Sequence, residues 1–311
     1  MSTATARLLA LTFALTISAT VSASSFSFTT IDVPGADATL PIAINSSGQI
    51  VGYFTSGSDT HGFIYSSGTF TPFDVPDGTG QTFATGINDS GQISGYYLDA
   101  SSVEHGFVDT NGSFMTIDAP GAVNTQAWGI NNSGEISGGY SDGTSAHGFI
   151  DDGGTFTNVD VSGAMGTVPS AINNNGDAVG VYADSSYALH GFTDINGSID
   201  LFDIPGEENI QVFGINDADQ VIGGFDDSSG SSHGFIKTGN SFSFIDVPDG
   251  TNGTAATGIN DNGVIVGAYD DDNFVVHGFI GIPTVPEPST LVLLMSGILG
   301  AACARRARSK R

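Results

Sequence analysis

Short segments of alternating apolar and polar residues, separated by turn residues, run through most of the chain. In residues 125–161 the segments TQAWGIN, EISGGY, AHGFIDD and TFTNVDV are separated by Asn-Ser-Gly, Ser-Asp-Gly and Asp-Gly-Gly turns. Alternation with a period of two indicates β-strands, and Asn, Asp and Gly tolerate the left-handed backbone of tight turns. Four strands of about five residues with ordinary connections fill one such unit. The pattern therefore predicts an all-β chain with four short strands per unit.

Three sequence markers recur with one period of about 43 residues, as is typical of repeat proteins. They are a His-Gly-Phe triplet, an Ile-Asn pair, and an apolar residue followed by Asp. The copies are His61, His105, His147, His190, His233 and His277 for the triplet, Asn45, Asn88, Asn131, Asn173, Asn216 and Asn260 for the pair, and Asp32, Asp74, Asp118, Asp160, Asp203 and Asp246 for the third marker. Three markers with one period indicate six copies of one structural unit.

The two ends of the repeat array complement each other. Residues 26–34, FSFTTIDVP, correspond to the fourth strand of a unit without its first three, and residues 275–283, VVHGFIGIP, end on a third strand without a fourth. Four strands per 40–45 residues is the size of a β-propeller blade. We expect residues 26–32 to pair with residues 277–282, which closes a six-bladed β-propeller and removes two exposed strand edges. An open β-solenoid is the alternative.

Composition and charge agree with an all-β exported body. The chain has 44 glycines and only 13% charged residues, which favours turns over helices. Between Arg7 and Arg305 a single cation, Lys237, stands among all 33 acidic residues. Such a surface repels nucleic acid and anionic head groups. The single cysteine, Cys303, lies near the C-terminus, so the body must be stable without a disulfide.

Residues 1–23 have the pattern of a secretory signal peptide. Arg7 precedes an apolar run from Leu8 to Val21, and Val21-Ser22-Ala23 fits a small-residue cleavage site. We expect export through the Sec machinery and a mature body that spans residues 24–284.

Residues 285–311 form a three-part tail: a Pro-rich turn, an apolar run from Leu291 to Ala304 and a basic cluster. A helix of this run would span roughly 21 Å, less than the ~30 Å of a bilayer core. The tail resembles the PEP-CTERM sorting signal of Gram-negative bacteria through Val285, Pro286, Glu287, Pro288, Arg305 and Arg306. The resemblance implies a short transmembrane helix, transient inner-membrane tethering, recognition by an exosortase, and release to the cell surface or extracellular matrix.

The repeat itself resembles the exported proteins with HAF repeats, named for a His-Ala-Phe motif. The likeness covers residues 26–283, where the Ile-Asn-x-x-Gly turn and the His-small-Phe strand recur. Glycine stands where that motif has alanine, at Gly62, Gly106, Gly148, Gly191, Gly234 and Gly278. This resemblance implies no activity.

The recurrent His and Asp residues are interpreted as structural. Six histidines spread around a ring cannot share one metal ion, because ligands must lie within about 2.0–2.2 Å of it. We expect each imidazole to bond to a neighbouring strand or to the recurrent Asp, and each adjacent Phe to fill the space between blades. The recurrent Asp is expected to accept hydrogen bonds where strands end.

Positions that differ among the copies are the candidates for function. Trp128, the only tryptophan, could stack on a sugar or fill the core; its equivalents are Ile42, Thr85, Ser170, Phe213 and Thr257. Asp270, Asp271 and Asp272, like the DDSS segment at 226–229, offer oxygen ligands for Ca²⁺, yet they lack the spacing of a dedicated loop, so solubilising charge is the alternative. We otherwise expect no cofactor.

No enzyme motif stands out in the body, and no catalytic residue is predicted. The absence of arginine excludes a bidentate carboxylate clamp, and no phosphate loop, Cys nucleophile or HExxH motif is present. The sequence therefore favours a non-catalytic exported propeller that binds or scaffolds extracellular polysaccharide. The alternative is a glycan-cleaving or other hydrolytic propeller, which would bring several acids and Trp128 together at one mouth of the ring.

Overall fold

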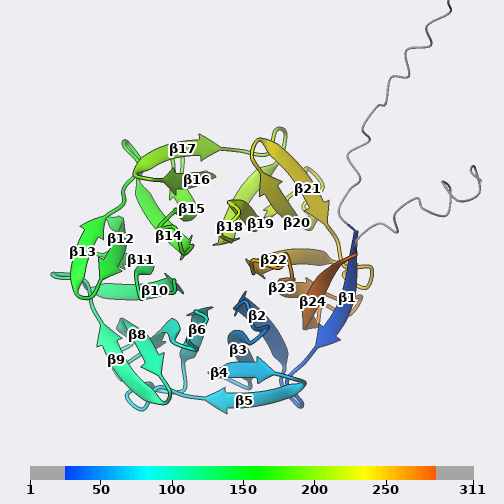
Figure 1. Cartoon of the computed structure of the whole chain (residues 1–311), viewed down its shortest axis with the longest axis horizontal. Coiled ribbons are helices and arrows are strands. Elements are labelled where there is room, and N and C mark those ends of the chain that lie inside the picture. The colour runs from blue at the N-terminus through cyan, green and yellow to red at the C-terminus, as the bar shows by residue number, and fades with distance from the viewer. Residues whose placement is uncertain (1–24, 285–311) are drawn as a thin grey trace, which may run out of the picture.

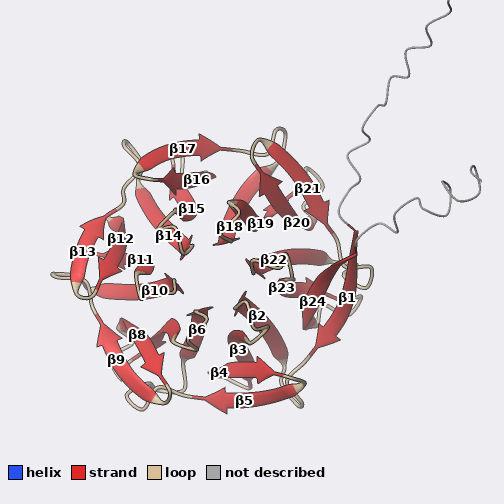
Figure 2. Cartoon of the chain, in the orientation of Figure 1, coloured by secondary structure: helices blue, strands red, loops and turns tan. Residues whose placement is uncertain are grey.

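The computed structural model describes residues 25–284, and every element in that range is a β-strand. The strands form four-stranded antiparallel sets arranged around a central axis, here called modules 1 to 6 (Figures 1 and 2). In each module the first strand lies nearest the axis and the fourth lies at the rim. The predicted all-β fold and the four strands per unit are present.

Module 1 contains β2 (Ala38–Ile44), β3 (Ile50–Ser56), β4 (Asp59–Ser66) and β5 (Thr69–Phe73), and module 2 contains β6 (Thr82–Ile87), β7 (Ile93–Leu98), β8 (Glu104–Thr110) and β9 (Ser113–Ile117). Module 3 contains β10 (Asn124–Ile130), β11 (Ile136–Ser141), β12 (Ala146–Asp152) and β13 (Thr155–Asn158), and module 4 contains β14 (Gly166–Ile172), β15 (Ala178–Ala183), β16 (Leu189–Ile195) and β17 (Ser198–Phe202). Module 5 contains β18 (Glu208–Ile215), β19 (Gln220–Asp226), β20 (Ser232–Thr238) and β21 (Ser241–Ile245), and module 6 contains β22 (Gly253–Ile259), β23 (Ile265–Asp270), β24 (Val276–Thr284) and β1 (Ser25–Ile31).

The N-terminal strand completes the last module. β1 pairs antiparallel with β24, from Ser25 opposite Thr284 to Ile31 opposite Gly278. Phe28 packs edge-on against Phe279 with ring centroids 5.5 Å apart. The pairing predicted between residues 26–32 and 277–282 is therefore present, and the first and last described residues lie side by side (Figure 1).

A β-bulge in the first strand bends it against the second strand in every module. A recurrent glycine of the second strand lies opposite this bulge. At Gly52 an added Cβ would lie 2.0 Å from the Leu40 carbonyl oxygen, and at Gly138 it would lie 2.3 Å from the Gln126 carbonyl oxygen. Neither contact can be relieved without moving backbone, so these positions require glycine.

The core consists of clusters that join neighbouring modules. The phenylalanine of each His-Gly-Phe triplet has no exposed surface: Phe63, Phe107, Phe149, Phe192, Phe235 and Phe279. Phe107 packs in one cluster with Ala84 of its own module and Val51 of module 1. These phenylalanines occupy the space between modules that the sequence pattern predicted for them.

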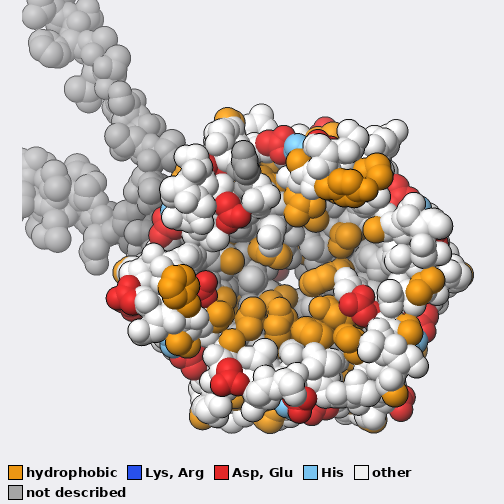
Figure 3. All heavy atoms as spheres, turned by 180° about the vertical axis from the view of Figure 1, so that it is seen from behind, with side chains coloured by type: hydrophobic (Ala, Val, Ile, Leu, Met, Phe, Trp, Pro, Cys, Tyr) orange, Lys and Arg blue, Asp and Glu red, His pale blue; other side chains and the backbone are white. Residues whose placement is uncertain are grey.

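The ring has two different ends. The turns between first and second strands, which begin at the six Asn of the Ile-Asn pairs, lie at the end called here the Asn face, and β24 ends there at Thr284. The connections between second and third strands, such as residues 99–103, lie at the opposite end, called the loop face. Figure 3 shows the side turned away from the viewer of Figure 1, with hydrophobic side chains around a central hollow.

The predicted signal peptide (1–23) and the predicted transmembrane helix of the tail (285–311) lie outside the described residues. Within residues 25–284, no helix has the length and apolar character needed to span a bilayer.

Candidate functional site

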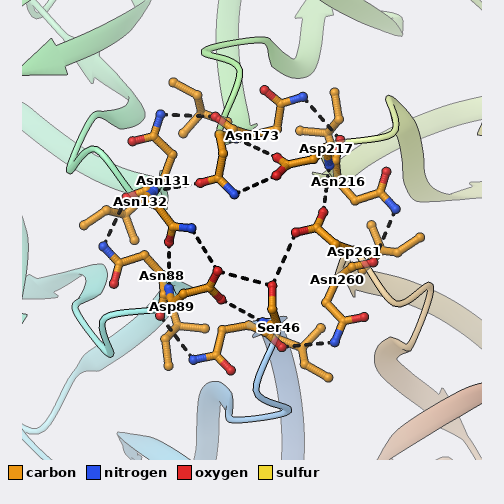
Figure 4. Close-up of a pocket in the computed structure, with 18 residues that line it drawn as sticks. Ser46, Asn88, Asp89, Asn131, Asn132, Asn173, Asn216, Asp217, Asn260 and Asp261 are labelled. Atoms are coloured by element: carbon orange, nitrogen blue, oxygen red, sulfur yellow. Dashed lines mark hydrogen bonds between the residues drawn. The ribbon is translucent and has the colours of Figure 1, made fainter.

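A closed ring of hydrogen bonds links all modules at the Asn face (Figure 4). Each Asn of the Ile-Asn pairs is buried, and its Nδ2 donates to the backbone carbonyl of the equivalent Asn in the next module. The six bonds are Asn45 to Asn88 (3.1 Å), Asn88 to Asn131 (3.1 Å), Asn131 to Asn173 (3.1 Å), Asn173 to Asn216 (3.2 Å), Asn216 to Asn260 (3.3 Å) and Asn260 to Asn45 (3.0 Å). The sequence showed these residues only as repeat markers.

A second, exposed ring follows one residue later: Ser46, Asp89, Asn132, Asn174, Asp217 and Asp261. Backbone N–H groups donate to the side chain of the next module, as in Asp89 N to Asn132 Oδ1 at 2.8 Å. Burial alone would raise the pKa of Asp89, but hydrogen bonds from Asn132 and Ser46 hold it below its usual value. The cavity between the rings measures about 80 Å³, far below the ~300 Å³ of small ligand pockets. We interpret this face as structural.

The recurrent His and Asp residues form one pair per module near the loop face. Each His Nδ1 donates to its Asp. Of the two partners expected for the imidazole, a neighbouring strand or the recurrent Asp, the structure shows the recurrent Asp. The pairs are His61–Asp74 (2.9 Å), His105–Asp118 (3.0 Å), His147–Asp160 (3.2 Å), His190–Asp203 (2.8 Å), His233–Asp246 (2.7 Å) and His277–Asp32 (2.8 Å). The structure thus spreads the six histidines around the ring, and no two of them share a partner.

Five of these histidines also face a second carboxylate, from the connection between second and third strands. The Nε2–carboxylate distances are 3.8 Å for His105–Asp99, 3.6 Å for His147–Asp142, 3.5 Å for His190–Asp184, 3.4 Å for His233–Asp227 and 3.7 Å for His277–Asp271. The hydrogen bond that His190 donates to Asp203 raises the pKa of His190, and the one that His233 donates to Asp246 raises the pKa of His233. An imidazole with an acceptor at each nitrogen is best satisfied when protonated, because only then do both nitrogens donate.

The candidate Ca²⁺ ligands Asp270, Asp271 and Asp272 each interact with different groups. Asp270 ends β23, and Asp271 accepts hydrogen bonds from the backbone of Asn273 and Val275 in its own loop. Asp272 accepts a hydrogen bond from Thr251. Within residues 25–284, no three His, Cys, Asp or Glu side chains are grouped so as to hold a metal ion.

Four aromatic rings from modules 1 to 3 form a continuous row, here called the aromatic row. The row consists of Tyr53 on β3, Phe83 on β6, Tyr96 on β7 and Trp128 on β10. Ring centroids are 5.1 Å apart for Tyr53–Phe83, 4.6 Å for the stacked pair Phe83–Tyr96 and 5.7 Å for Tyr96–Trp128. All four side chains are half-buried, so part of each ring remains open to solvent.

The aromatic row has no counterpart in modules 4 to 6. The positions equivalent to Tyr53 and Tyr96 hold Gly139, Val181, Gly224 and Ala268. The hydrophobic lining of the hollow in Figure 3 is likewise uneven around the axis. The loop face therefore departs from the regularity of the repeat over modules 1 to 3.

Trp128 also replaces an inter-module hydrogen bond. At its equivalent position, Thr85 donates to the Ala127 carbonyl (2.9 Å). In the same way, Ser170 donates to the Val212 carbonyl (2.5 Å) and Thr257 to the Pro41 carbonyl (2.7 Å). Trp128 has no hydroxyl for such a bond, and its buried Nε1 has no partner among the described residues.

Polar groups border the aromatic row. Gln126 Nε2 donates to Glu104 Oε2 at 2.9 Å, which links β10 to the start of β8. Burial raises the pKa of Tyr96, and the nearby Tyr53 and Glu104 raise it further. Burial also raises the pKa of Tyr53. Two phenol groups, one indole N–H, one carboxylate and one amide therefore lie along one apolar surface.

Sequence reasoning identified Trp128 as a possible ligand contact and missed the other three rings. Tyr53 and Tyr96 share one repeat position and Phe83 stands at another, on a different strand, so no local motif connects them with Trp128. The available signal was a comparison of every repeat position across the six copies, which shows tyrosine in two copies where the others have glycine, alanine or valine.

Comparisons with known proteins identify a sorting motif and a fold. Residues 284–307 match the family model of the PEP-CTERM protein-sorting motif, as predicted for the tail. No curated protein matches the chain in sequence. The tail match indicates an exported protein.

Two solved structures illustrate the fold. A point mutant of the Aleuria aurantia lectin, in complex with Fucα1-6GlcNAc, is 13% identical with a TM-score of 0.51, and the alignment covers 81% of this chain and 98% of the lectin. The β-propeller domain of the trilobed protease from Pyrococcus furiosus is 11% identical with a TM-score of 0.50, covering 82% and 85%. At these identities the likeness concerns the fold alone. The chain is therefore an all-β protein of β-propeller-like fold that carries a PEP-CTERM sorting motif.

Proposed function

We propose that the chain is an exported, non-catalytic six-bladed β-propeller, with modules 1 to 6 as its blades and β1 closing the ring, and that it binds extracellular polysaccharide along the aromatic row. The aromatic row is the single observation that carries this proposal. Sugars present apolar C–H faces and polar hydroxyl edges, so they are bound by flat aromatic surfaces bordered by polar groups. Tyr and Trp supply such surfaces at low entropic cost.

The cost of Trp128 to the fold supports a functional role. Three other modules gain an inter-module hydrogen bond at this position, worth about 0.5–1.5 kcal/mol each. Trp128 forgoes that bond and leaves its indole N–H buried without a partner, which costs roughly 1–3 kcal/mol more. Residues that reduce stability without structural benefit concentrate at functional sites.

The distribution of acids favours binding over catalysis. Glycoside hydrolysis uses two carboxylates about 5–9.5 Å apart on either side of the scissile bond. At the aromatic row, Glu104 is the carboxylate whose charge acts on Tyr96. Asp89, Asp217 and Asp261 lie at the opposite mouth, in the ring of the Asn face. The carboxylate linked by hydrogen bonds to the strand of Trp128 is Glu104, which supports binding as the proposal.

The sorting route completes the proposal. A signal peptide at 1–23 directs export, the tail at 285–311 holds the protein in the inner membrane through a short helix, and an exosortase removes the tail. The mature protein then belongs to the cell surface or extracellular matrix of a Gram-negative bacterium. The repeat resembles that of the exported HAF-repeat proteins, with glycine in place of the alanine of the His-Ala-Phe motif, and we include the chain among them in this proposal.

The test is a retention assay with the extracellular polysaccharide of the producing cells and the exported protein as the cells release it. We expect retention of the protein on the polysaccharide without new reducing ends. Trp128→Ala should weaken retention at least about tenfold, because central Trp contacts are typically worth ~2 kcal/mol or more. Phe213→Ala is the matched control, since Phe213 holds the same repeat position in module 5 outside the aromatic row.

Two results would contradict the proposal. Release of reducing ends by the wild type, lost in Glu104→Ala, would establish the hydrolytic alternative. Equal retention of Trp128→Ala and Phe213→Ala would move the binding surface away from the aromatic row. Thermal unfolding of both variants shows whether either has simply lost its fold.

A further inference from the structure

We infer that the aromatic row accepts uncharged sugars and rejects uronic acids, and that Glu104 is the residue that sets this selectivity. The inference rests on the proposed function and names the class of glycan that the same site takes. It depends on the position of the Glu104 carboxylate and on the distance of Lys237, the one lysine of residues 25–284, from the aromatic row.

Glu104 is held in place at the edge of the aromatic row. Its backbone N–H donates to Asn124 Oδ1 at 3.0 Å, and its side chain accepts the Gln126 amide at 2.9 Å. Both contacts come from the first strand of module 3, the strand that carries Trp128. The carboxylate is therefore fixed to the strand that carries the indole ring, through the side chain two residues before Trp128. Its charge also contributes to the raised pKa of Tyr96.

No lysine or arginine is positioned to offset this charge. Residues 25–284 contain no arginine and one lysine, Lys237. Lys237 lies near the end of β20 at the Asn face of module 5, with its ammonium 4.8 Å from the centroid of the Phe202 ring. A uronate on the aromatic row would therefore bring a second negative charge close to Glu104 without a counter-charge. Like charges at a partly buried site disfavour binding and act as a specificity device.

The same groups suit a neutral sugar. The Glu104 carboxylate accepts hydrogen bonds from sugar hydroxyls, and bonds to an ionised acceptor are stronger than neutral ones. The hydroxyls of Tyr53 and Tyr96 make no hydrogen bond with the other described residues, so both can serve a ligand. Flat rings, a fixed acceptor and free hydroxyls together match an uncharged polyhydroxylated chain.

The experiment compares two ligands that differ only in charge. A neutral β-1,4-glucan is used as such and after oxidation of its C6 hydroxymethyl groups to carboxylates. Binding of both to the exported protein is measured by calorimetry at low ionic strength. We expect the neutral polymer to bind at least about tenfold more tightly, and the difference to shrink as added salt screens the repulsion.

Glu104→Gln tests the residue itself, because it keeps the shape and an acceptor oxygen but removes the charge. The preference for the neutral polymer should fall below about threefold, mainly through tighter binding of the oxidised polymer. Glu207→Gln is the matched control: it removes one negative charge from the connection between modules 4 and 5, away from the aromatic row, and should leave the preference unchanged.

The outcomes separate this inference from the proposed function. Equal binding of the two polymers by the wild type, or an unchanged preference in Glu104→Gln, would overturn the inference while glycan binding stands. Binding of neither polymer, and no retention on the producer's own polysaccharide, would overturn the proposed function itself. Tighter binding of the oxidised polymer would contradict the inference directly.

Discussion

The two faces of the ring differ in how strictly they follow the repeat. At the Asn face all six modules contribute the same side chain and the same hydrogen bond, and the bonds close on themselves (Figure 4). At the loop face the equivalent positions range from tryptophan to serine and from tyrosine to glycine. A residue repeated in all six modules supports the fold that they share. A residue that differs in a few modules can instead contact a ligand that binds only at those modules.

The same difference separates stability from binding. Substitution at the Asn face should cost stability by a similar amount in any module. Substitution at the aromatic row should cost binding and leave stability nearly unchanged. Each of the following predictions tests this separation, in order of its expected effect on the free energy of unfolding.

Asn131→Ala should lower the free energy of unfolding by about 2–4 kcal/mol. The Asn131 side chain donates to Asn173 O in a buried setting and to Glu135, and accepts from the backbone of Ser133 and Glu135 in part-buried ones. The alanine variant removes all four bonds and leaves the buried Asn173 carbonyl without this donor. Denaturant unfolding measures the change. Retention on polysaccharide, measured on the folded fraction, should not change.

Asn132→Ala is the control for that prediction. Asn132 is the exposed neighbour of Asn131, and water can replace its bonds, so the loss should stay below about 1 kcal/mol. Equal losses for the two variants would mean that the buried ring contributes no more to stability than the exposed one.

The pairs of His190 and His233 should make stability depend on pH above about 6.5. Because the pKa values of His190 and His233 are raised in the folded protein, the pairs stabilise it fully below the unfolded value of about 6.5. That contribution is lost as the pH rises through the raised pKa. His233→Gln should reduce the fall in stability between about pH 6.5 and 8, by less than ~1 kcal/mol, since the pair is partly exposed.

Ser228→Ala, in the loop that carries Asp227, is the control for the titration. This serine is exposed and has no titratable group near neutral pH, so the variant should keep the wild-type slope. A His233→Gln variant with the same slope as wild type would show that this pair is not a source of the pH dependence.

Trp128→Thr should change the free energy of unfolding least, by about 1 kcal/mol or less. The substitution removes a half-buried ring but restores the hydroxyl that modules 2, 4 and 6 have, here within reach of the Pro169 carbonyl. The new bond of about 0.5–1.5 kcal/mol offsets part of the lost burial. Retention on polysaccharide should nevertheless fall at least about tenfold. A large loss of stability instead would assign Trp128 to the core.

The repeat made most of the architecture predictable. The three repeat markers predicted the period, and the alternation of apolar and polar residues predicted four strands per unit. One unit is divided between the two ends of the array, FSFTTIDVP and VVHGFIGIP, and this division predicted the pairing of β1 with β24. These predictions depend on local patterning and on counting, both of which a single sequence contains. The sorting motif was equally local, because its three parts follow one another in 27 residues.

The contacts between modules could not be predicted in the same way. The Ile-Asn pair predicted a turn, but its bond to the next module depends on how neighbouring sheets are inclined. Tyr53, Phe83, Tyr96 and Trp128 come together because the strands of three modules bring their rings into contact. Glu104 belongs to none of the repeat markers, and its link to the strand of Trp128 follows only from the packing of β8 against β10.

The position of Thr284 has a mechanical consequence. β24 carries the sorting motif at its end, and it is hydrogen-bonded to β23 on one side and to β1 on the other. A pull on the following residues therefore loads two strand pairs in shear along their length, where many hydrogen bonds must break together. An edge strand would instead peel away one bond at a time. In the proposed tethered state, the strand that completes the circle would thus also let the protein bear tension.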